Sequence, residues 1–200
     1  MKNQPFSQEL ESWLKTKDTK TLGDMQRVFG EKSFAILFLL FMFIPSLPIP
    51  TGGITHVVLL PVVMLAALQM IFGQRTLWFP KRIERIKLGE KTLEKALPFI
   101  VRRIRWFERF SRPRLAKWLQ SAVFRSTAGL WVLLLALAAF IAPPFSGLDT
   151  LPSLGAVIIS LSIILEDIAL FFVGIIVGSI GLGVIVATAG VISQAIQHYF

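Results

Sequence analysis

The stretch that decides the fold runs from Ile168 to Ser193, IALFFVGIIVGSIGLGVIVATAGVIS, and its 26 residues include no charged side chain. A helix that crosses the hydrocarbon core of a bilayer needs about 20 such residues. A surface helix of a soluble protein would instead carry a polar stripe on the face that meets water. The stretch has no such stripe, so the sequence predicts an integral membrane protein.

The charges of the 200-residue chain are unevenly placed. Fifteen of the 21 Lys and Arg residues fall between Arg75 and Arg125, and none follows Arg125. Such a basic block fits nucleic-acid binding or the positive-inside rule of membrane proteins, and its place between apolar segments favours the second. We therefore expect residues 75–125 and the N-terminus to face the cytoplasm, with anionic lipid headgroups as partners and no nucleic acid. No cleavable signal is visible in the polar first 32 residues.

Two further apolar regions are each interrupted by proline and glycine. The first region is broken by Pro45-Ser46-Leu47-Pro48-Ile49-Pro50-Thr51-Gly52-Gly53, and the second by Pro143-Pro144-Phe145-Ser146-Gly147-Leu148-Asp149-Thr150-Leu151-Pro152. Proline removes amide donors and ends a helix, and glycine permits a sharp turn. The pattern predicts broken helical hairpins over 33–73 and 127–165, and a last membrane helix over 168–195.

Amphipathic helices are predicted before each hairpin, over 5–31 and 97–124, with a basic cytoplasmic linker at 75–96. Thr21 and Asp24 have the spacing of a capping box, and Gly30 is a natural helix stop. In the second pair, an apolar stripe is flanked by side chains expected to contact lipid at the interface. These side chains are Arg102, Arg103, Arg105, Trp106 and Arg109.

Shifting the chain by about 95 residues superimposes the amphipathic helices and the breaks, as repeat architectures require. The predicted fold is thus an all-α membrane protein with a first repeat at 1–74, a second at 97–200 and a final transmembrane helix. The breaks are external turns between full spans or the tips of re-entrant hairpins, and the sequence leaves both open. The 12 residues from Ser33 to Ile44 cover only about 18 Å of helix, short of the roughly 30 Å core. Charge favours entry of both hairpins from the same side.

With these motifs in place, the chain resembles the ExoD exopolysaccharide-synthesis family of bacterial membrane proteins. The matching residues include Phe43-Ile44-Pro45-Ser46-Leu47-Pro48-Ile49-Pro50-Thr51-Gly52, Ala66-Ala67-Leu68-Gln69-Met70-Ile71-Phe72-Gly73 and Trp78-Phe79-Pro80. Two positions depart from the family pattern: Glu166-Asp167-Ile168-Ala169 lacks the usual arginine, and Asp149 stands where Asn is usual. The resemblance implies a multi-pass inner-membrane protein connected with exopolysaccharide production, without an established chemical activity.

Paired broken helices are a recognised indication of a binding site in membrane proteins. Thr55 and Thr150 follow the breaks and are expected to act as helix N-caps, while Gln69 is expected to hydrogen-bond across helices. Glu166 and Asp167 either bind an ion at membrane depth or lie in a cytoplasmic turn. The candidate binding residues are Pro45, Pro48, Pro50, Gly52, Gly53, Thr55, Gln69, Pro143, Pro144, Asp149, Thr150, Glu166 and Asp167.

No nucleophile–base pair, phosphate loop or metal signature is visible, so no catalytic residue, metal or cofactor is expected. The leading interpretation is a protein that binds and moves a lipid-like or polysaccharide-linked substrate at the hairpins. The alternatives are a non-catalytic accessory subunit that binds polysaccharide-synthesis proteins, and an enzyme acting on a lipid-linked sugar. A cavity reaching both breaks favours the first, and tightly packed hairpins favour the second. A cleft that gathers Glu166, Asp167 and arginines favours the third. Homo-oligomerisation stays open.

Overall fold

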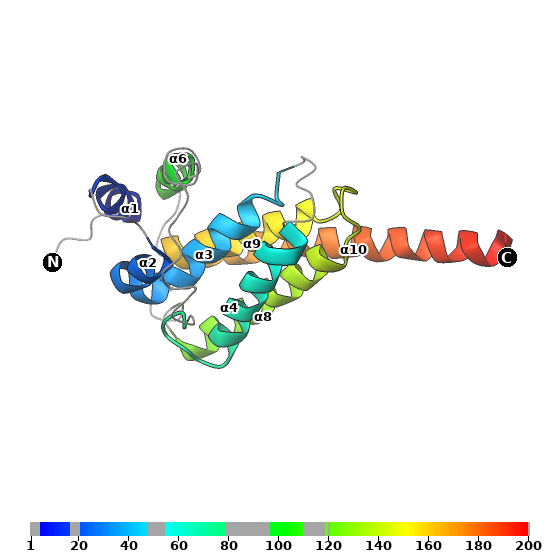
Figure 1. Ribbon diagram of the computed structural model, residues 1–200, viewed down its shortest axis with the longest axis horizontal. Helices are drawn as coiled ribbons and strands as arrows, with labels where there is room; N and C mark the ends of the chain where they lie inside the picture. Colours follow the sequence, from blue (N-terminus) through cyan, green and yellow to red (C-terminus); the bar gives the residue numbers. More distant parts are fainter. Residues whose placement is uncertain are drawn as a thin grey trace.

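The computed structural model describes residues 5–16, 21–47, 55–78, 97–109, 119 and 121–199, and every regular element in these ranges is helical. This confirms the predicted all-α class (Figure 1). The elements are α1 (Phe6–Lys15), α2 (Leu22–Phe29), η1 (Gly30–Lys32), α3 (Ser33–Phe43), η2 (Thr55–Leu59), α4 (Leu60–Ile71), α6 (Leu97–Glu108), α8 (Ala122–Ile141), α9 (Thr150–Leu165) and α10 (Ile168–Tyr199).

The centre of the molecule is a bundle of α3, α4, α8, α9 and the first half of α10. Helix α3 is apolar around its whole circumference, and every side chain from Ser33 to Leu40 is buried. A helix without a polar face must be enclosed by other helices or by lipid. Helix α9 packs against α3 and α10, and α4 packs against α8. The arms of the two hairpins are therefore interleaved across the bundle.

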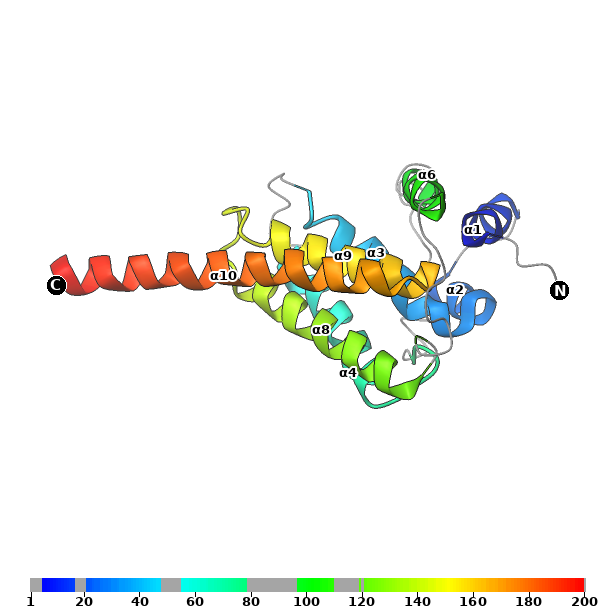
Figure 2. The same ribbon diagram turned by 180° about the vertical axis from the view of Figure 1, so that it is seen from behind.

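Both proline breaks lie at the same end of this bundle, where α3 and α8 end and where η2 and α9 begin (Figures 1 and 2). The other end carries α1, α2 and α6. Helices α1 and α6 lie side by side, and their axes run across the long axis of the bundle (Figure 1). A helix that rests on a membrane surface takes this orientation relative to helices that enter the membrane.

Helix α10 extends well beyond the bundle (Figure 2). Among the described residues, two helices are long and apolar enough to cross a membrane: Ala122–Ile141 in α8 and Ile168–Val191 in α10. Shorter apolar helices cover Thr55–Ile71 and Thr150–Leu165. The glycines of α10 mark where its contacts with the bundle stop. Gly181 lies against Pro152 of α9, whereas Gly183 and Gly190 have only open space where a Cβ would be.

The N-terminal helices follow the predicted local signals. Thr21 and Asp24 form the complete capping box at the start of α2: the Asp24 amide donates to Thr21 Oγ1 and the Thr21 amide donates to Asp24 Oδ2, both at 3.1 Å. Gly30 ends α2 with a φ of 51°, in the region that favours glycine. Both predictions are confirmed. The capping box and Gly30 thus fix the start and the end of α2, just before the buried helix α3.

Candidate functional site

A histidine links the two hairpins beside their breaks. His56 Nε2 lies 3.1 Å from the carbonyl oxygen of Ala142 at the end of α8, and Nδ1 lies 3.2 Å from Thr55 Oγ1. A carbonyl oxygen only accepts, so the Nε2–H group is the donor. In the neutral ring, Nδ1 then accepts from the threonine hydroxyl. His56 therefore ties the start of the second arm of one hairpin to the end of the first arm of the other.

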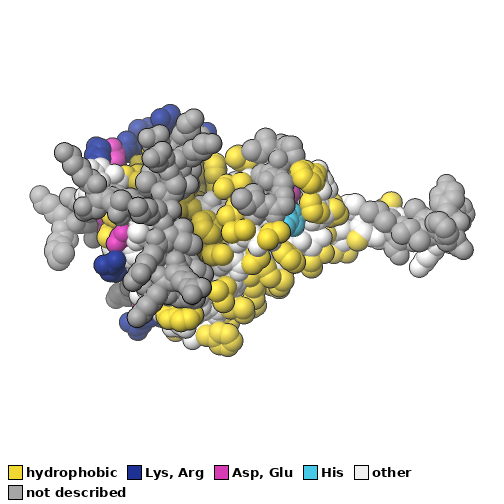
Figure 3. All heavy atoms as spheres, in the orientation of Figure 1, with side chains coloured by type: hydrophobic (Ala, Val, Ile, Leu, Met, Phe, Trp, Pro, Cys, Tyr) yellow, Lys and Arg dark blue, Asp and Glu magenta, His cyan; other side chains and the backbone are white. Residues whose placement is uncertain are grey.

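Several polar side chains at the ends of the hairpin arms are buried. Thr55 is fully buried, and Ser46 and Asp149 are 8% and 9% exposed. The Ser46 hydroxyl donates to the Phe43 carbonyl at 2.6 Å. A buried polar group costs free energy unless it has a partner, so such side chains are uncommon in an apolar bundle. In Figure 3 the His side chain lies at this end, within a largely hydrophobic surface.

Of the two threonines after the breaks, Thr150 does not have the predicted capping role. Thr150 is the first residue of α9, the N-cap position belongs to Asp149, and no side chain caps this helix. The prediction is wrong because α9 begins one residue earlier than a cap at Thr150 requires. Thr55 begins the π-helix η2, and its hydroxyl contacts the His56 ring. Capping by Thr55 stays a prediction.

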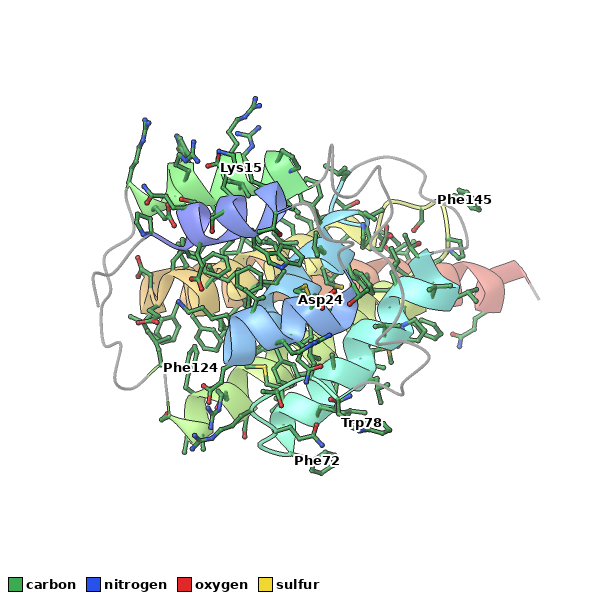
Figure 4. All side chains as sticks on the ribbon, turned by 60° about the vertical axis from the view of Figure 1, so that its left-hand side comes forward. Lys15, Asp24, Phe72, Trp78, Phe124 and Phe145 are labelled. Atoms are coloured by element: carbon green, nitrogen blue, oxygen red, sulfur yellow. The ribbon has the colours of Figure 1, made fainter. Side chains whose placement is uncertain are left out.

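The second break turns through two residues of positive φ, Phe145 at 67° and Gly147 at 72°. Positive φ is strained for phenylalanine, and 71% of the Phe145 side chain is exposed. Figure 4 shows Phe145 pointing away from the bundle, at the opposite end from Phe72 and Trp78. Pro143 and Pro144 are exposed, whereas Pro45 of the first break is buried. Four predicted site residues, Pro48, Pro50, Gly52 and Gly53, lie outside the described residues.

The acidic pair lies at the other end of the bundle. Glu166 has a φ of 54° in the turn between α9 and α10, and its carboxylate lies 3.5 Å from Lys32 Nζ. Asp167 Oδ1 accepts from the Ala169 amide at 3.0 Å, which satisfies a free donor at the start of α10. Glu166 and Asp167 therefore lie at a turn between two helices and do not join the breaks; a cytoplasmic position for this turn stays a prediction.

Gln69 also differs from its prediction. Its side-chain amide donates to the Trp78 carbonyl at 3.1 Å, and its oxygen accepts from the Trp78 amide at 2.7 Å. These bonds hold the connector after α4 and do not reach a neighbouring helix. The side chain is buried, so the two bonds remove the cost of leaving an amide unpaired.

An ion-pair cluster that the sequence patterns did not reveal joins the two halves of the chain. Glu31 Oε2 lies 2.8 Å from Arg125 Nη1, and Glu31 Oε1 lies 3.7 Å from Arg75 Nε. The Arg125 side chain is only 13% exposed, and its buried Nε has no partner. Glu31 and Arg125 are 94 residues apart, close to the spacing at which the two halves superimpose. This agreement with the repeat offset is the feature of the sequence that could have indicated the ion pair.

Helix α6 joins α1 through polar contacts. Arg105 bonds to Glu11, and Glu108 Oε1 accepts from the Ser7 amide at 2.9 Å. The Lys15 ammonium, and after it the Arg105 guanidinium, hold the pKa of the exposed Glu11 carboxyl below its usual range. The side chains predicted to contact lipid, Arg102, Arg103, Arg105, Trp106 and Arg109, are all exposed on α6. Exposure is consistent with lipid contact but leaves it a prediction.

An apolar groove of about 330 Å³ lies beneath α6. It is bounded by α3 with the residues after it, by α6 and by α9. Its lining residues are Leu39, Phe43, Leu47, Ile100, Arg103, Ile104, Phe107, Leu154, Val157, Ile158 and Leu161. Leu47 and Leu154 flank the two breaks, so the groove extends from α6 toward the site at His56. Within the part of the chain that is described, no three His, Asp or Glu side chains gather into a potential metal site.

The chain was compared with known proteins. Neither a curated protein nor a solved structure matches it. Residues 6–187 match the sequence pattern of the family described as "Exopolysaccharide synthesis, ExoD". This range includes both hairpins, the ion-pair cluster and the groove, and leaves out only short segments at the ends. The chain therefore belongs to the ExoD family, whose members take part in exopolysaccharide synthesis.

Proposed function

We propose that this protein binds and moves an amphipathic, polysaccharide-linked lipid at two hairpins that enter the bacterial inner membrane from the cytoplasmic side. The observation that carries the proposal is the contact of His56, which follows the first break, with Ala142, which precedes the second, together with the burial of Thr55 and Asp149. Irregular backbone at membrane depth persists where protein or a polar cavity satisfies it, and such places are where membrane proteins bind polar substrates.

The contacts between helices support two parallel repeats. Helix α1 packs on α6, α3 packs on α9 and α4 packs on α8. A two-fold relation between residues 1–74 and 97–200 would generate each of these pairs. Helices α3 and α8 run in one direction along the bundle, and α4 and α9 run in the other (Figures 1 and 2). The repeats would thus enter from the same side, as the charge distribution predicts.

The length of the hairpins supports re-entrance. From Ile168, beside the charged turn, to Gly181, beside Pro152, α10 rises by about 20 Å. The hydrocarbon core is about 30 Å thick. If the turn at Glu166 and Lys32 lies at the cytoplasmic face, the breaks stop about 10 Å short of the opposite face. Helix α8 is also long enough to cross the core but ends at the second break, whereas α10 continues past that break and its apolar part extends to Val191.

The distribution of side chains supports this orientation. Figure 3 shows Lys and Arg side chains gathered at the end with α1, α2 and α6, and a hydrophobic surface over the bundle. Trp78 and Trp106 are 63% and 52% exposed near the basic end. Tryptophan is enriched at membrane interfaces, and positive charge marks the cytoplasmic side. The N-terminus and the basic linker would then be cytoplasmic.

The groove favours a binding protein over the alternatives. A purely supporting subunit needs no lined cavity between its hairpins, whereas this groove ends beside both breaks at Leu47 and Leu154. An enzyme that uses Glu166 and Asp167 would gather them with arginines around a phosphate. Instead, Glu166 pairs with Lys32 and Asp167 binds the backbone of α10.

Cysteine labelling tests the topology cleanly, because the natural chain contains no cysteine. Single cysteines at Ser12, Ser146 and Gln197 place α1, the second break and the end of α10. We expect a membrane-impermeant maleimide to label Ser12→Cys only in inside-out vesicles and Gln197→Cys only in intact cells. Ser146→Cys should react from neither side until the membrane is dissolved. Free labelling of Ser146→Cys from outside would contradict the re-entrant hairpin.

Exopolysaccharide output tests the site itself. In a bacterium that lacks its own copy, His56→Ala and Asp149→Leu should lower secreted polysaccharide at unchanged membrane levels of the protein. Val57→Ala is the matched control, because Val57 is adjacent and 76% exposed. Normal output from both site variants would contradict substrate binding at the breaks and favour the accessory role.

A further inference from the structure

The groove beneath α6 has the form of a channel for one hydrocarbon chain. Leu39, Phe43 and Leu47 are spaced by four residues, so they form one row that rises by about 12 Å along α3 and beyond its end. Helix α9 supplies the facing row, from Leu154 to Leu161. The floor is closed, since Leu39, Val157 and Leu161 are all at most 6% exposed. The channel thus has two facing apolar walls, and the residues of its floor are buried.

One wall of this channel carries a positive charge. Arg103 of α6 is the only charged side chain among the described lining residues. Ile100 and Ile104 of the same helix also line the channel and are 3% and 0% exposed. Arginine recognises phosphate through several N–H donors held in a fixed plane. A molecule that fills the channel and also meets Arg103 needs an apolar tail and an anionic head.

We propose that the groove holds a lipid with a single hydrocarbon chain and a phosphate headgroup, with the chain between α3 and α9 and the phosphate at Arg103. This inference rests on the proposed function, because it names the lipid class of the same substrate and its entry from the cytoplasmic leaflet. The volume of about 330 Å³ is at the lower end of the range for small-molecule sites. A diacyl phospholipid would have to leave its second chain outside.

The groove reaches residues at both breaks. Leu47 lies in the first break and is its last described residue, and Leu154 lies in the first turns of α9 after the second break. A chain held between these two rows would point toward the breaks. The groove would therefore hold the lipid while its head stays at the level of α6.

The test is a binding measurement on the purified full-length protein in neutral detergent, with a polyprenyl monophosphate as the probe. Arg103→Gln should weaken binding about tenfold, the effect of losing about one charge-assisted hydrogen bond. Arg109→Gln is the matched control, because Arg109 is an exposed arginine at the end of α6 that does not line the groove. It should bind within about twofold of the natural protein.

Two tryptophan substitutions test where the hydrocarbon chain of the lipid lies. Ile158→Trp fills the groove from its partly exposed rim and should abolish binding, whereas Ile176→Trp, on an exposed face of α10, should not. Inorganic phosphate and phosphatidylglycerol are the competitors. Inorganic phosphate should not displace the probe, because it has no chain to fill the groove. Equal competition by phosphatidylglycerol, or equal binding by Arg103→Gln and Arg109→Gln, would overturn the inference.

The outcomes also separate this inference from the proposed function. If His56→Ala abolishes polysaccharide output while Arg103→Gln and Ile158→Trp bind the probe like the natural protein, the hairpin site stands and the groove inference fails. If the groove variants lose the probe while His56→Ala and Asp149→Leu secrete normally, the groove stands and the hairpin site fails.

Discussion

Gly155 of α9 faces Gly178 of α10 so closely that a Cβ on Gly155 would lie 2.6 Å from the Gly178 Cα atom. Gly174 and Gly178 are four residues apart on α10, and a Cβ on Gly174 would lie 2.9 Å from the Gly155 carbonyl oxygen. Small residues at this spacing let two helix backbones approach each other in a membrane. The motif therefore acts within the fold, where it joins the α9–α10 hairpin.

This contact predicts a position-dependent effect of alanine along α10. Gly155→Ala and Gly174→Ala, whose Cβ atoms would each meet the backbone of the other helix, should each lower the free energy of unfolding by about 1–3 kcal/mol, the usual cost of overpacking. Unfolding of the detergent-solubilised protein with dodecyl sulfate measures this value. Gly183→Ala and Gly190→Ala are the controls, because a Cβ there meets nothing within 4 Å. Equal losses at all four positions would show that α9 and α10 do not pack as described.

The pair Glu31–Arg125 predicts a second effect on stability. Arg125→Gln should destabilise the protein by about 1–3 kcal/mol, because it removes a charge-assisted hydrogen bond from a largely buried arginine. Arg75→Gln should cost less than about 1 kcal/mol, since Arg75 is 75% exposed and its contact with Glu31 is longer. A double-mutant cycle with Glu31→Gln isolates the pair. A coupling free energy near zero between positions 31 and 125 would contradict this account.

Gln69 predicts a local change in hydrogen exchange. Its oxygen accepts from the Trp78 amide, so Gln69→Leu should expose that amide and speed its exchange by about tenfold or more, for one lost hydrogen bond. Gln69→Glu keeps an acceptor at the same place and should preserve most of the protection. Amide exchange followed by mass spectrometry on the 73–78 peptide distinguishes the two variants. If both exchange at the rate of the natural protein, the Trp78 amide is protected by another group.

The contact between α1 and α6 is predicted to depend on pH. The pKa of Glu11 is lowered in the folded protein, first by its hydrogen bond with Lys15 and then by Arg105. The stabilisation is therefore present above the ordinary pKa of a glutamate and is lost as the pH falls through the lowered value. Proteolysis of the α1 segment should become faster on acidification from pH 7 toward pH 3.

Glu11→Gln is the control for this pH effect. It should give faster proteolysis already at pH 7 and a smaller change on acidification than the natural protein. Glu108, which accepts from Ser7 in the same contact, stays in both proteins, so the difference between them reports Glu11 alone. Identical pH profiles would show that the Glu11–Arg105 contact does not hold α1 against α6.

The sequence by itself determined those features that depend on neighbours within a few helical turns. The charge-free run after Asp167 predicts α10, the prolines predict where α3 and α8 end, and the pair Thr21–Asp24 predicts the start of α2. These signals are local because hydrogen bonds within a helix join residues four positions apart. The matching residues around Pro45 and Gln69 also carried the family assignment.

Only the tertiary structure decided which segments meet. That His56 bonds to Ala142, that Glu31 pairs with Arg125 and that Gln69 turns back to Trp78 all depend on how the helices pack. Apolar side chains satisfy many packings almost equally well, because burial of apolar surface has no preferred direction. The close approach at Gly155 and Gly178 and the few directional polar contacts select one arrangement. That arrangement brings both breaks to one end of the bundle and opens the groove beneath α6.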